Sequence, residues 1–347
     1  MLIGIPKEIF PEEKRVAALP RTVGKYINLG FDVAVESSAG ESIFISDDEY
    51  EFAGARLIPD AENLFAESDV ILKVNQPAFN EHIEKHEVNM LRDDSTLIAF
   101  FYPTANESHE IIKRLRDKNI TAFTMANIPR SSRAQKMNTL SSMSVVTGYK
   151  AVIMAANQMQ RFVPMIVTAN GKIKPAQFLV IGTGAVGLQA IATAKQLGGV
   201  VEALDIRESA CIGAKSIGAE VVNLYIPQEF TAENEGHKRF LDDWWLETEQ
   251  SIISPHLEDA DVVILSAHVP GEAAPILVTE QMISTMRPGS VIMDISADQG
   301  GNCEVTEPGQ ILQRLGVYVC GIQNMPRMMA MDASSLYAEN IYYFVEN

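Results

Sequence analysis

The stretch Phe178-Leu-Val-Ile-Gly182-Thr-Gly184-Ala-Val-Gly187 decides the fold of the second half of the chain. An apolar run is followed at once by glycines in the spacing G-x-G-x-x-G, and residues 188–197 continue with the pattern of a helix. A strand, a glycine-rich turn and a helix in this order open a dinucleotide-binding unit. The stretch therefore predicts a Rossmann-type α/β domain.

Each glycine of the motif has its own physical reason. Gly182 permits a tight turn after the strand, and Gly184 permits a phosphate to approach backbone N–H groups. Gly187 permits the helix to pack closely on the strand. With Ala185 and Val186, these residues direct the helix N-terminus at a pyrophosphate. The alternative is a domain whose glycines only shape the turn and bind nothing.

An acidic residue follows the next apolar run. Asp205 lies about 20 residues after Gly182, where a carboxylate accepts hydrogen bonds from the adenosine ribose and repels the 2′-phosphate of NADP. Arg207 can pair with such a phosphate, but after Ile206 at a strand end we expect it to lie along the adenine. These residues predict NAD(H) rather than NADP(H) as the ligand of this domain.

Two later apolar runs end in the segments Ser266-Ala267-His268 and Ser296-Ala297-Asp298. Ligands of open α/β sheets bind at the carboxyl ends of the strands, so we expect Ala267 and His268 to face the nicotinamide half of the cofactor. A histidine there can serve as acid or base, but a wall or hydrogen-bonding role is commoner. We therefore assign it no proton transfer.

The first half of the chain shows a second α/β pattern. Helical patterns over residues 22–29 and 107–116 separate short apolar runs. The runs read as buried parallel strands, and they cover residues 2–5, 33–35, 70–74, 97–101 and 122–125. This alternation predicts a flavodoxin-like domain.

Helical spacing then continues for about twenty residues after Asn138, which indicates a helix bridging two domains. Residues 332–345 also have helical spacing, and we expect them to pack onto the first domain. The predicted fold class is α/β, with two Rossmann-like doubly wound parallel-sheet domains separated by a cleft. Residues 1–138 and 327–347 form the N-terminal domain, and residues 139–326 form the NAD(H) domain.

The composition limits the class of function. The formal net charge of −17 over 347 residues disfavours binding to nucleic acid and direct insertion into a membrane. Three cysteines without a C-x-x-C pair fit a reducing cytoplasm, and the N-terminus lacks an export signal. His82 and His86 are spaced i, i+4, but charged neighbours favour a solvated helix face. We predict no metal site.

A long motif suggests the family. The stretch Pro129-Arg130-Ser-Ser-Arg133-Ala134-Gln135-Lys136-Met137-Asn138-Thr-Leu140-Ser141-Ser142, followed by Gly148-Tyr149-Lys150-Ala151-Val152, resembles the signature of the NAD(H)-binding alpha subunit, or domain I, of proton-translocating NAD(P) transhydrogenase. The resemblance extends to Gly4-Ile-Pro-Lys-Glu8 and Gly300-Gly-Asn-Cys-Glu304. Alanine dehydrogenase is the sister group.

The resemblance implies an activity and partners. Subunits of this kind are homodimers that bind NADH, dock against a separate NADP(H)-binding component and pass hydride from one nicotinamide to the other. A membrane component couples this transfer to proton movement, so the subunit is cytoplasmic and peripheral to the inner membrane through its partners. Direct transfer requires that two rings be positioned, and it requires no nucleophile or metal.

The resemblance also implies roles for the motif. Arg130, Gln135 and Ser141 hold the nicotinamide and its ribose, and Gln135 reaches toward the partner's nucleotide. Arg133 and Asn138 belong to the same cofactor-binding loop. This chain departs from the pattern, because Asn138 stands where the family has Asp and Met143 where Gln is expected. The chain also stops at Asn347, earlier than is common.

Two alternatives remain open. An alanine dehydrogenase would use Arg15, Lys73 and Asp298 for substrate binding and proton transfer, although the histidine expected after residues 97–101 is absent. The same three residues would otherwise form an ion network. The second alternative is an inactive relative that only binds NAD, suggested by Asn138 and the early end.

The Asn138 departure yields a first prediction. One lost ionic hydrogen bond costs roughly 1–3 kcal/mol, so restoring the carboxylate with Asn138→Asp should raise the rate of hydride transfer. Single-turnover kinetics with an NADP-binding component measure this, and an unchanged rate would count against a role of the loop in transfer.

Overall fold

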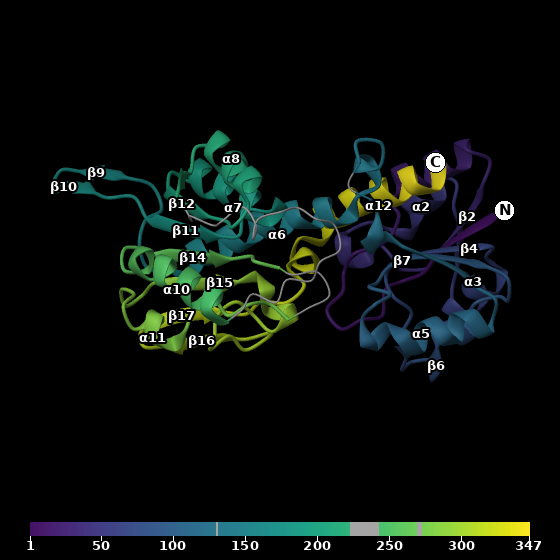
Figure 1. Ribbon diagram of the computed structural model, residues 1–347. Helices are drawn as coiled ribbons and strands as arrows, with labels where there is room; N and C mark the ends of the chain where they lie inside the picture. Colours follow the sequence, from purple (N-terminus) through teal and green to yellow (C-terminus); the bar gives the residue numbers. More distant parts are fainter. Residues whose placement is uncertain (130, 223–242, 269–272) are drawn as a thin grey trace. The chain divides into compact units, whose positions relative to one another are not determined.

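The computed structural model describes the chain except residues 130, 223–242 and 269–272, and it leaves the side chains of residues 106, 107, 243 and 244 undescribed (Figure 1). Contacts divide the chain into two units, one of Met1–Val146 with Pro326–Asn347 and one of Thr147–Met325. Each unit contains a largely parallel sheet with helices. The predicted α/β class with two Rossmann-like sheets is confirmed.

The second unit is built on a seven-stranded sheet of order β13-β12-β11-β14-β15-β17-β16. All neighbouring strands are parallel except β17 and β16. The strand order reverses between β11 and β14, where ligands of such sheets bind. The strands are β11 (Gln177–Ile181), β12 (Val200–Leu204), β13 (Glu220–Val221), β14 (Val262–Leu265), β15 (Val291–Asp294), β16 (Ile311–Arg314) and β17 (Val317–Cys320).

Alternating side chains of β11 bury both faces of this sheet. Phe178 and Val180 pack in a cluster that includes Ala190 of α7 on one face. Leu179 and Ile181 pack in another cluster that includes Ile253 of α10. The helical elements are α6 (Thr139–Gln158), α7 (Ala185–Gln196), α8 (Glu208–Ser216), α10 (Asp243–Leu257), α11 (Glu280–Ile283) and η4 (Ile295–Gln299), and a separate hairpin joins β9 (Ile166–Thr168) to β10 (Gly171–Ile173).

The first unit contains a six-stranded parallel sheet of order β3-β2-β1-β4-β7-β8. The flavodoxin-like order predicted for it differs, because here both β2 and β3 lie on one side of β1 before the chain crosses to the other side. Local patterns of strands and helices are the same in both topologies. The strands are β1 (Leu2–Ile5), β2 (Asp32–Glu36), β3 (Arg56–Ile58), β4 (Val70–Asn75), β7 (Thr96–Phe100) and β8 (Thr121–Thr124), with a small hairpin of β5 (Phe79–Asn80) and β6 (Lys85–His86).

The C-terminal helix α12 (Ala330–Glu346) belongs to the core of this unit. The Tyr337 hydroxyl is buried and donates to the Lys73 carbonyl at 2.9 Å. The Tyr342 ring packs on Tyr26 with centroids 5.6 Å apart. The other helical elements are α1 (Pro20–Asn28), η1 (Glu41–Ile43), α2 (Asp47–Phe52), α3 (Ala61–Glu67), α4 (Glu87–Met90), α5 (Asn106–Asp117), η2 (Met125–Asn127), η3 (Gln135–Met137) and η5 (Met325–Met329).

Helix α6 runs through the division between the units, which falls between Val146 and Thr147. Sequence reasoning placed the division at the start of this helix. No helix in the described ranges combines the length and apolar character needed to cross a bilayer.

A buried charge cluster lies at the carboxyl ends of β1 and β4. Lys73 is fully buried, and its Nζ lies 2.8 Å from Glu87 Oε1 and 3.6 Å from Glu8 Oε2. The Val74 N–H donates to Glu8 at 2.7 Å. Burial lowers the pKa of Lys73, but Glu8 and Glu87 outweigh this and hold it above its ordinary value. The lysine is therefore charged and compensated within the unit.

Removing this lysine should destabilise the first unit. Lys73→Met leaves Glu87 and Glu8 without their cation in a buried site, which costs roughly 3–5 kcal/mol. Lys85→Met is the matched control, because the Lys85–Glu62 pair is exposed and worth about 0–1 kcal/mol. Urea unfolding of the full chain, followed by circular dichroism, compares the two variants. Equal losses would contradict the assignment of Lys73 as the charge that holds the cluster.

Candidate functional site

The glycine motif forms a tight turn between β11 and α7. Gly182 has φ +88°, a left-handed conformation that favours glycine. A Cβ on Gly187 would lie 2.0 Å from the Gly182 carbonyl oxygen, whereas a Cβ on Gly184 would meet nothing closer than Arg207 Nη2 at 3.9 Å. Gly187 is therefore needed for packing inside the protein, and Gly184 borders open space at the N-terminus of α7. This arrangement fits a pyrophosphate.

Asp205 is buried at the end of β12 and bridges two segments. One oxygen accepts from the Thr183 N–H at 2.7 Å, and the carboxylate accepts from Arg207 Nε at 3.0 Å and Nη2 at 2.9 Å. Burial raises the pKa of Asp205, but the Arg207 bonds and the backbone N–H groups outweigh it and bring it below its ordinary value. Arg207 is thus ion-paired with Asp205, and Ile206 between them is partly exposed.

The ends of β14 and β15 are tied together by one amide. Asn302 is buried, its Oδ1 accepts from the Ala267 N–H at 3.0 Å, and its Nδ2 donates to the Ala267 carbonyl at 3.0 Å. The Ser296 hydroxyl donates to Asn302 Oδ1 at 2.6 Å. Ser266 Oγ donates to the Gly182 carbonyl at 2.7 Å. The segment that carries His268 therefore lies against the glycine turn.

The structure brings together all predicted residues of the glycine motif and of the strand ends within the second unit. Ala185 is exposed, and Val186 is half-buried at the start of α7. Ala267 is half-buried, and His268 is exposed. These positions agree with a ligand that lies along the carboxyl edge of the sheet.

The predicted cofactor-binding loop lies in the first unit. Arg130 is outside the described residues. Arg133, Gln135 and Ser141 are exposed, and Arg133 Nη2 lies 3.4 Å from Asn347 Oδ1. Asn138 differs from the others because it is buried, with 6% of its surface exposed. The exposed side chains are available to a ligand.

Asn138 caps helix α6. Its Oδ1 accepts from the Ser141 N–H at 2.9 Å, and its carbonyl accepts from the Ser142 N–H at 3.3 Å. These are the bonds of a helix N-cap, for which Asn and Asp serve about equally. The side chain expected to contact the cofactor thus has a structural partner in its own helix.

The loop is held at its base by α12. Asn340 Nδ2 donates to the Lys136 carbonyl at 2.7 Å, and Lys136 Nζ lies 4.8 Å from the centre of the Tyr343 ring. The Thr139 hydroxyl donates to the Met125 carbonyl at 2.7 Å. Gln135 is therefore presented from a braced 3-10 turn.

The three residues of the alternative substrate site differ in environment. Arg15 forms a bidentate pair with Glu13, with distances of 2.6 and 2.8 Å, and Lys73 is paired with Glu87. Asp298 is exposed in η4 and accepts from the Asn324 N–H at 3.3 Å. The ion-network interpretation therefore describes Arg15 and Lys73, and it does not describe Asp298.

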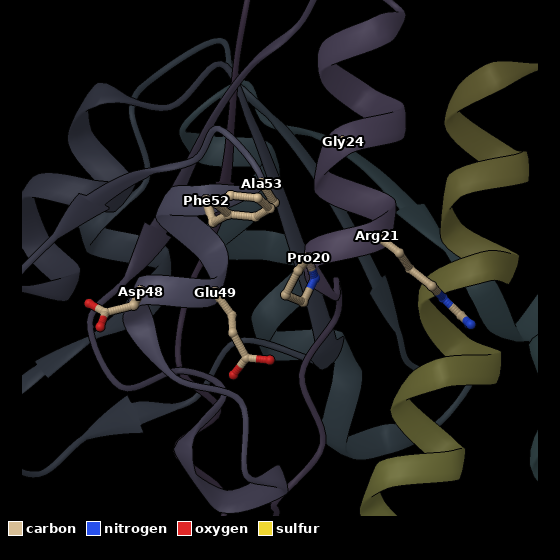
Figure 2. Close-up of a pocket in the computed structure, with 7 residues that line it drawn as sticks. All are labelled: Pro20, Arg21, Gly24, Asp48, Glu49, Phe52 and Ala53. Atoms are coloured by element: carbon tan, nitrogen blue, oxygen red, sulfur yellow. The ribbon is translucent and has the colours of Figure 1, made fainter.

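The largest depression on the first unit lies elsewhere. It has a volume of about 630 Å³ between α1 and α2, and Figure 2 shows Phe52 above it and Arg21 pointing toward α12. Arg21 donates to Ser335 at 2.7 Å, and Glu49 accepts from Ser46, so both are committed to structural bonds. The depression has no convergent polar groups of an active site.

The described residues contain no group of three or more His, Cys, Asp or Glu side chains arranged to hold a metal. The expectation that His82 and His86 share a helix face is wrong. His82 lies in a turn, and His86 caps α4 by accepting from the Val88 N–H at 3.2 Å.

Comparison with known proteins identifies the family. Residues 4–147 match the family described as "Alanine dehydrogenase/PNT, N-terminal domain", and residues 151–347 match "Alanine dehydrogenase/PNT, C-terminal domain". The chain belongs to the alanine dehydrogenase/PNT family. The family assignment agrees with the glycine motif and with both sheets.

Individual members of the alanine dehydrogenase/PNT family are similar over nearly the whole chain. An NAD(P) transhydrogenase alpha subunit of Rhodospirillum rubrum is 39% identical over 346 residues, 99% of this chain and 89% of that protein. An alanine dehydrogenase of Halomonas elongata is 31% identical over 341 residues, 96% and 84% of the two chains. A transhydrogenase structure from Sinorhizobium meliloti has a TM-score of 0.88 and 38% identity, and it covers 100% and 92%. The resemblance seen in the sequence is confirmed.

Sequence reasoning missed residues that shape the site in this family member. Thr183 holds Asp205, and Asn302 braces Ala267. Gly148 of α6 is also required, because a Cβ there would lie 2.3 Å from the Val186 carbonyl. The signal was present, since all three residues stand inside stretches that resemble the family, but their contacts depend on distant segments.

The two glycines that differ in surroundings should respond differently to alanine. Gly187→Ala forces a Cβ against the Gly182 carbonyl and should lower the free energy of unfolding by about 1–3 kcal/mol. Gly184→Ala meets open space, so stability should stay within about 0.5 kcal/mol while the NADH dissociation constant rises at least about tenfold, equal to roughly 1.4 kcal/mol. Fluorescence titration and thermal unfolding measure both quantities. Unchanged NADH binding by Gly184→Ala would show that the turn does not contact the cofactor.

Proposed function

We propose that this chain is the NAD(H)-binding component of an NAD(P) transhydrogenase. It would pass hydride between NADH and NADP(H) held on a separate component, and a membrane component would couple this to proton translocation. The observation that carries the proposal is the match of both domains to a family whose transhydrogenase alpha members are 39% identical over 99% of the chain.

The residues at the switch point of the second sheet fit a dinucleotide. Gly184 leaves open space in front of the N-terminus of α7, which attracts a pyrophosphate. Asp205 is held ionised at the end of β12. Ala267 and His268 follow β14 on the other side of the turn. The adenosine would therefore lie toward Asp205, and the nicotinamide half toward β14.

The Asp205–Arg207 pair supports NAD(H) over NADP(H). A bidentate guanidinium at 2.9 and 3.0 Å is committed to the carboxylate, so its charge is already balanced before a 2′-phosphate arrives. The adenosine ribose would take over part of these bonds at the carboxylate. Arg207 would not lie flat along the adenine, as the sequence suggested, while it remains paired in this way.

The loop supplies positioning groups. The bound cofactor supplies the hydride, and the chain has only to hold the donor ring in place for a second ring. Arg130, Gln135 and Ser141 are donors suited to this, and Asn138 orients the first turn of α6 that carries Ser141. In this scheme Asn138 acts through the helix and does not itself touch the cofactor.

One comparison tests the proposal against its alternatives. Purified protein with NADH is given pyruvate plus ammonia in one reaction, and an NADP-binding transhydrogenase component with an oxidised NADP analogue in another. Oxidation of NADH only in the second reaction supports the proposal. Oxidation only in the first would make the chain an amino-acid dehydrogenase, and NADH binding with neither reaction would identify an inactive relative.

Gln135 gives a more local test. Gln135→Asn shortens the side chain by one methylene and withdraws the amide from the acceptor ring, so single-turnover hydride transfer should slow at least about tenfold, equal to roughly 1.4 kcal/mol. Gln196→Asn is the control, because Gln196 is exposed at the end of α7. Equal rates in the two variants would remove Gln135 from the transfer step.

We also propose that the chain is a homodimer joined through the β9–β10 hairpin. Figure 1 shows this hairpin projecting from the second unit. A lone two-stranded hairpin is marginally stable in water, yet this one exposes apolar side chains, with Val167 67% and Met165 56% accessible. A second copy of the chain would cover them.

The dimer should depend on the hairpin. Val167→Asp introduces a charge into the proposed interface, and light scattering after size-exclusion chromatography should show the mass falling from dimer to monomer. Ile212→Asp is the matched control, because Ile212 is 63% exposed on α8. A dimer that survives Val167→Asp, or a monomeric wild type, would exclude this interface.

A further inference from the structure

Two side chains capable of proton transfer stand at neighbouring strand ends of the second sheet. Strands β14 and β15 are parallel and end in register at Leu265 and Asp294. His268 follows the first and Asp298 the second, and both are exposed. Hydride transfer between two nicotinamide rings moves no proton at the reacting atoms. The proposed transhydrogenase function therefore leaves this equipment unused.

The surroundings of His268 select one form of its ring. Nδ1 lies 3.4 Å from the Ser266 carbonyl oxygen and 3.5 Å from Ser296 Oγ. A carbonyl only accepts hydrogen bonds, and the Ser296 hydroxyl already donates its proton to Asn302 at 2.6 Å. Both neighbours therefore favour a proton on Nδ1 of the neutral ring. Nε2 is left as the basic atom, and no described residue forms a hydrogen bond with it.

The backbone that carries His268 is braced against the glycine turn. Asn302 holds Ala267 by two hydrogen bonds of 3.0 Å, and it also donates to the Pro275 carbonyl at 2.8 Å. Gly182 packs against this backbone so closely that a Cβ would lie 2.8 Å from the Ser266 carbonyl. Asp205 marks the adenosine side at β12, so the nicotinamide half extends toward β14 and β15. His268 stands on that side.

The charge of this edge restricts the substrate. Asp298 and Glu304 lie on the segment after β15, and neither residues 266–286 nor residues 295–313 include a Lys or Arg. A carboxylate substrate would find no counter-charge on these segments and would meet the Asp298 carboxylate. A small uncharged aldehyde or ketone carries no such penalty.

We propose that His268 is a catalytic residue for the reduction of small uncharged carbonyl compounds by NADH bound to this chain. The carbonyl carbon gains a hydride from the reduced nicotinamide nucleotide, which becomes NAD⁺. The π bond to oxygen opens, and the oxygen gains a proton from protonated Nε2, which solvent then recharges. The reverse reaction oxidises the alcohol, with Nε2 as the base. This activity rests on the proposed binding of NADH and requires no partner component.

The first test measures NADH oxidation by the full chain with propanal, hydroxyacetone or methylglyoxal, and with pyruvate as the charged comparison. The wild type should reduce at least one neutral compound faster than pyruvate. His268→Gln should slow that reduction at least about 100-fold, the size of a general-acid contribution. His256→Gln is the matched control, because His256 is paired with Glu202 at 2.8 Å on α10, and its rate should stay within about twofold.

A second readout does not depend on turnover. Histidine ring resonances of the labelled full chain are recorded by NMR, with the His268 signal assigned by its loss in His268→Gln. NADH should shift this signal and leave that of His256 in place. Bound NADH without a shift of His268, or without reduction of any neutral carbonyl, overturns the proposal. A chain that fails to bind NADH overturns the proposed function itself, so the two failures are distinguishable.

Discussion

The contact between Gly187 and the Gly182 carbonyl is the constraint on which the site depends. Helix α7 lies so close to the turn that a single methyl group on Gly187 would occupy the place of a backbone oxygen. This closeness brings the N-terminus of α7 to the end of β11, and it lets Asp205 reach back to the Thr183 N–H. The helix dipole, the open space at Gly184 and the ionised carboxylate then act on one ligand.

The two sheets use the same topological feature in different ways. In the first unit, the switch point between β1 and β4 is filled by Lys73 with Glu8 and Glu87. In the second unit, the switch point between β11 and β14 carries glycines and exposed side chains. Buried charges that satisfy one another leave no free valence for a ligand, whereas a turn without side chains leaves both space and N–H groups.

Polar side chains hold the second site from behind. Asn302 fixes the backbone of Ala267, and Arg207 fixes the Asp205 carboxylate. In the first unit, Asn138 caps the helix that begins at the cofactor loop. Each of these groups acts on its neighbour through hydrogen bonds whose geometry is specified at both ends. The substitution of Asn for the family's Asp at residue 138 therefore keeps the cap, because both side chains offer an acceptor oxygen to the Ser141 N–H.

The sequence by itself determined the elements and the motif, because periodicity and glycine spacing are local properties of the chain. The strands around residues 178–181 and 262–265, helix α6 and the roles of Gly182 and Gly187 followed from such local patterns. Only the tertiary structure decided the strand order of the first sheet, the pairing of Arg207 with Asp205, the cap at Asn138 and the surroundings of His268. Each of these depends on which distant segments meet, and a local pattern of hydrophobicity or spacing is the same whichever neighbour is chosen.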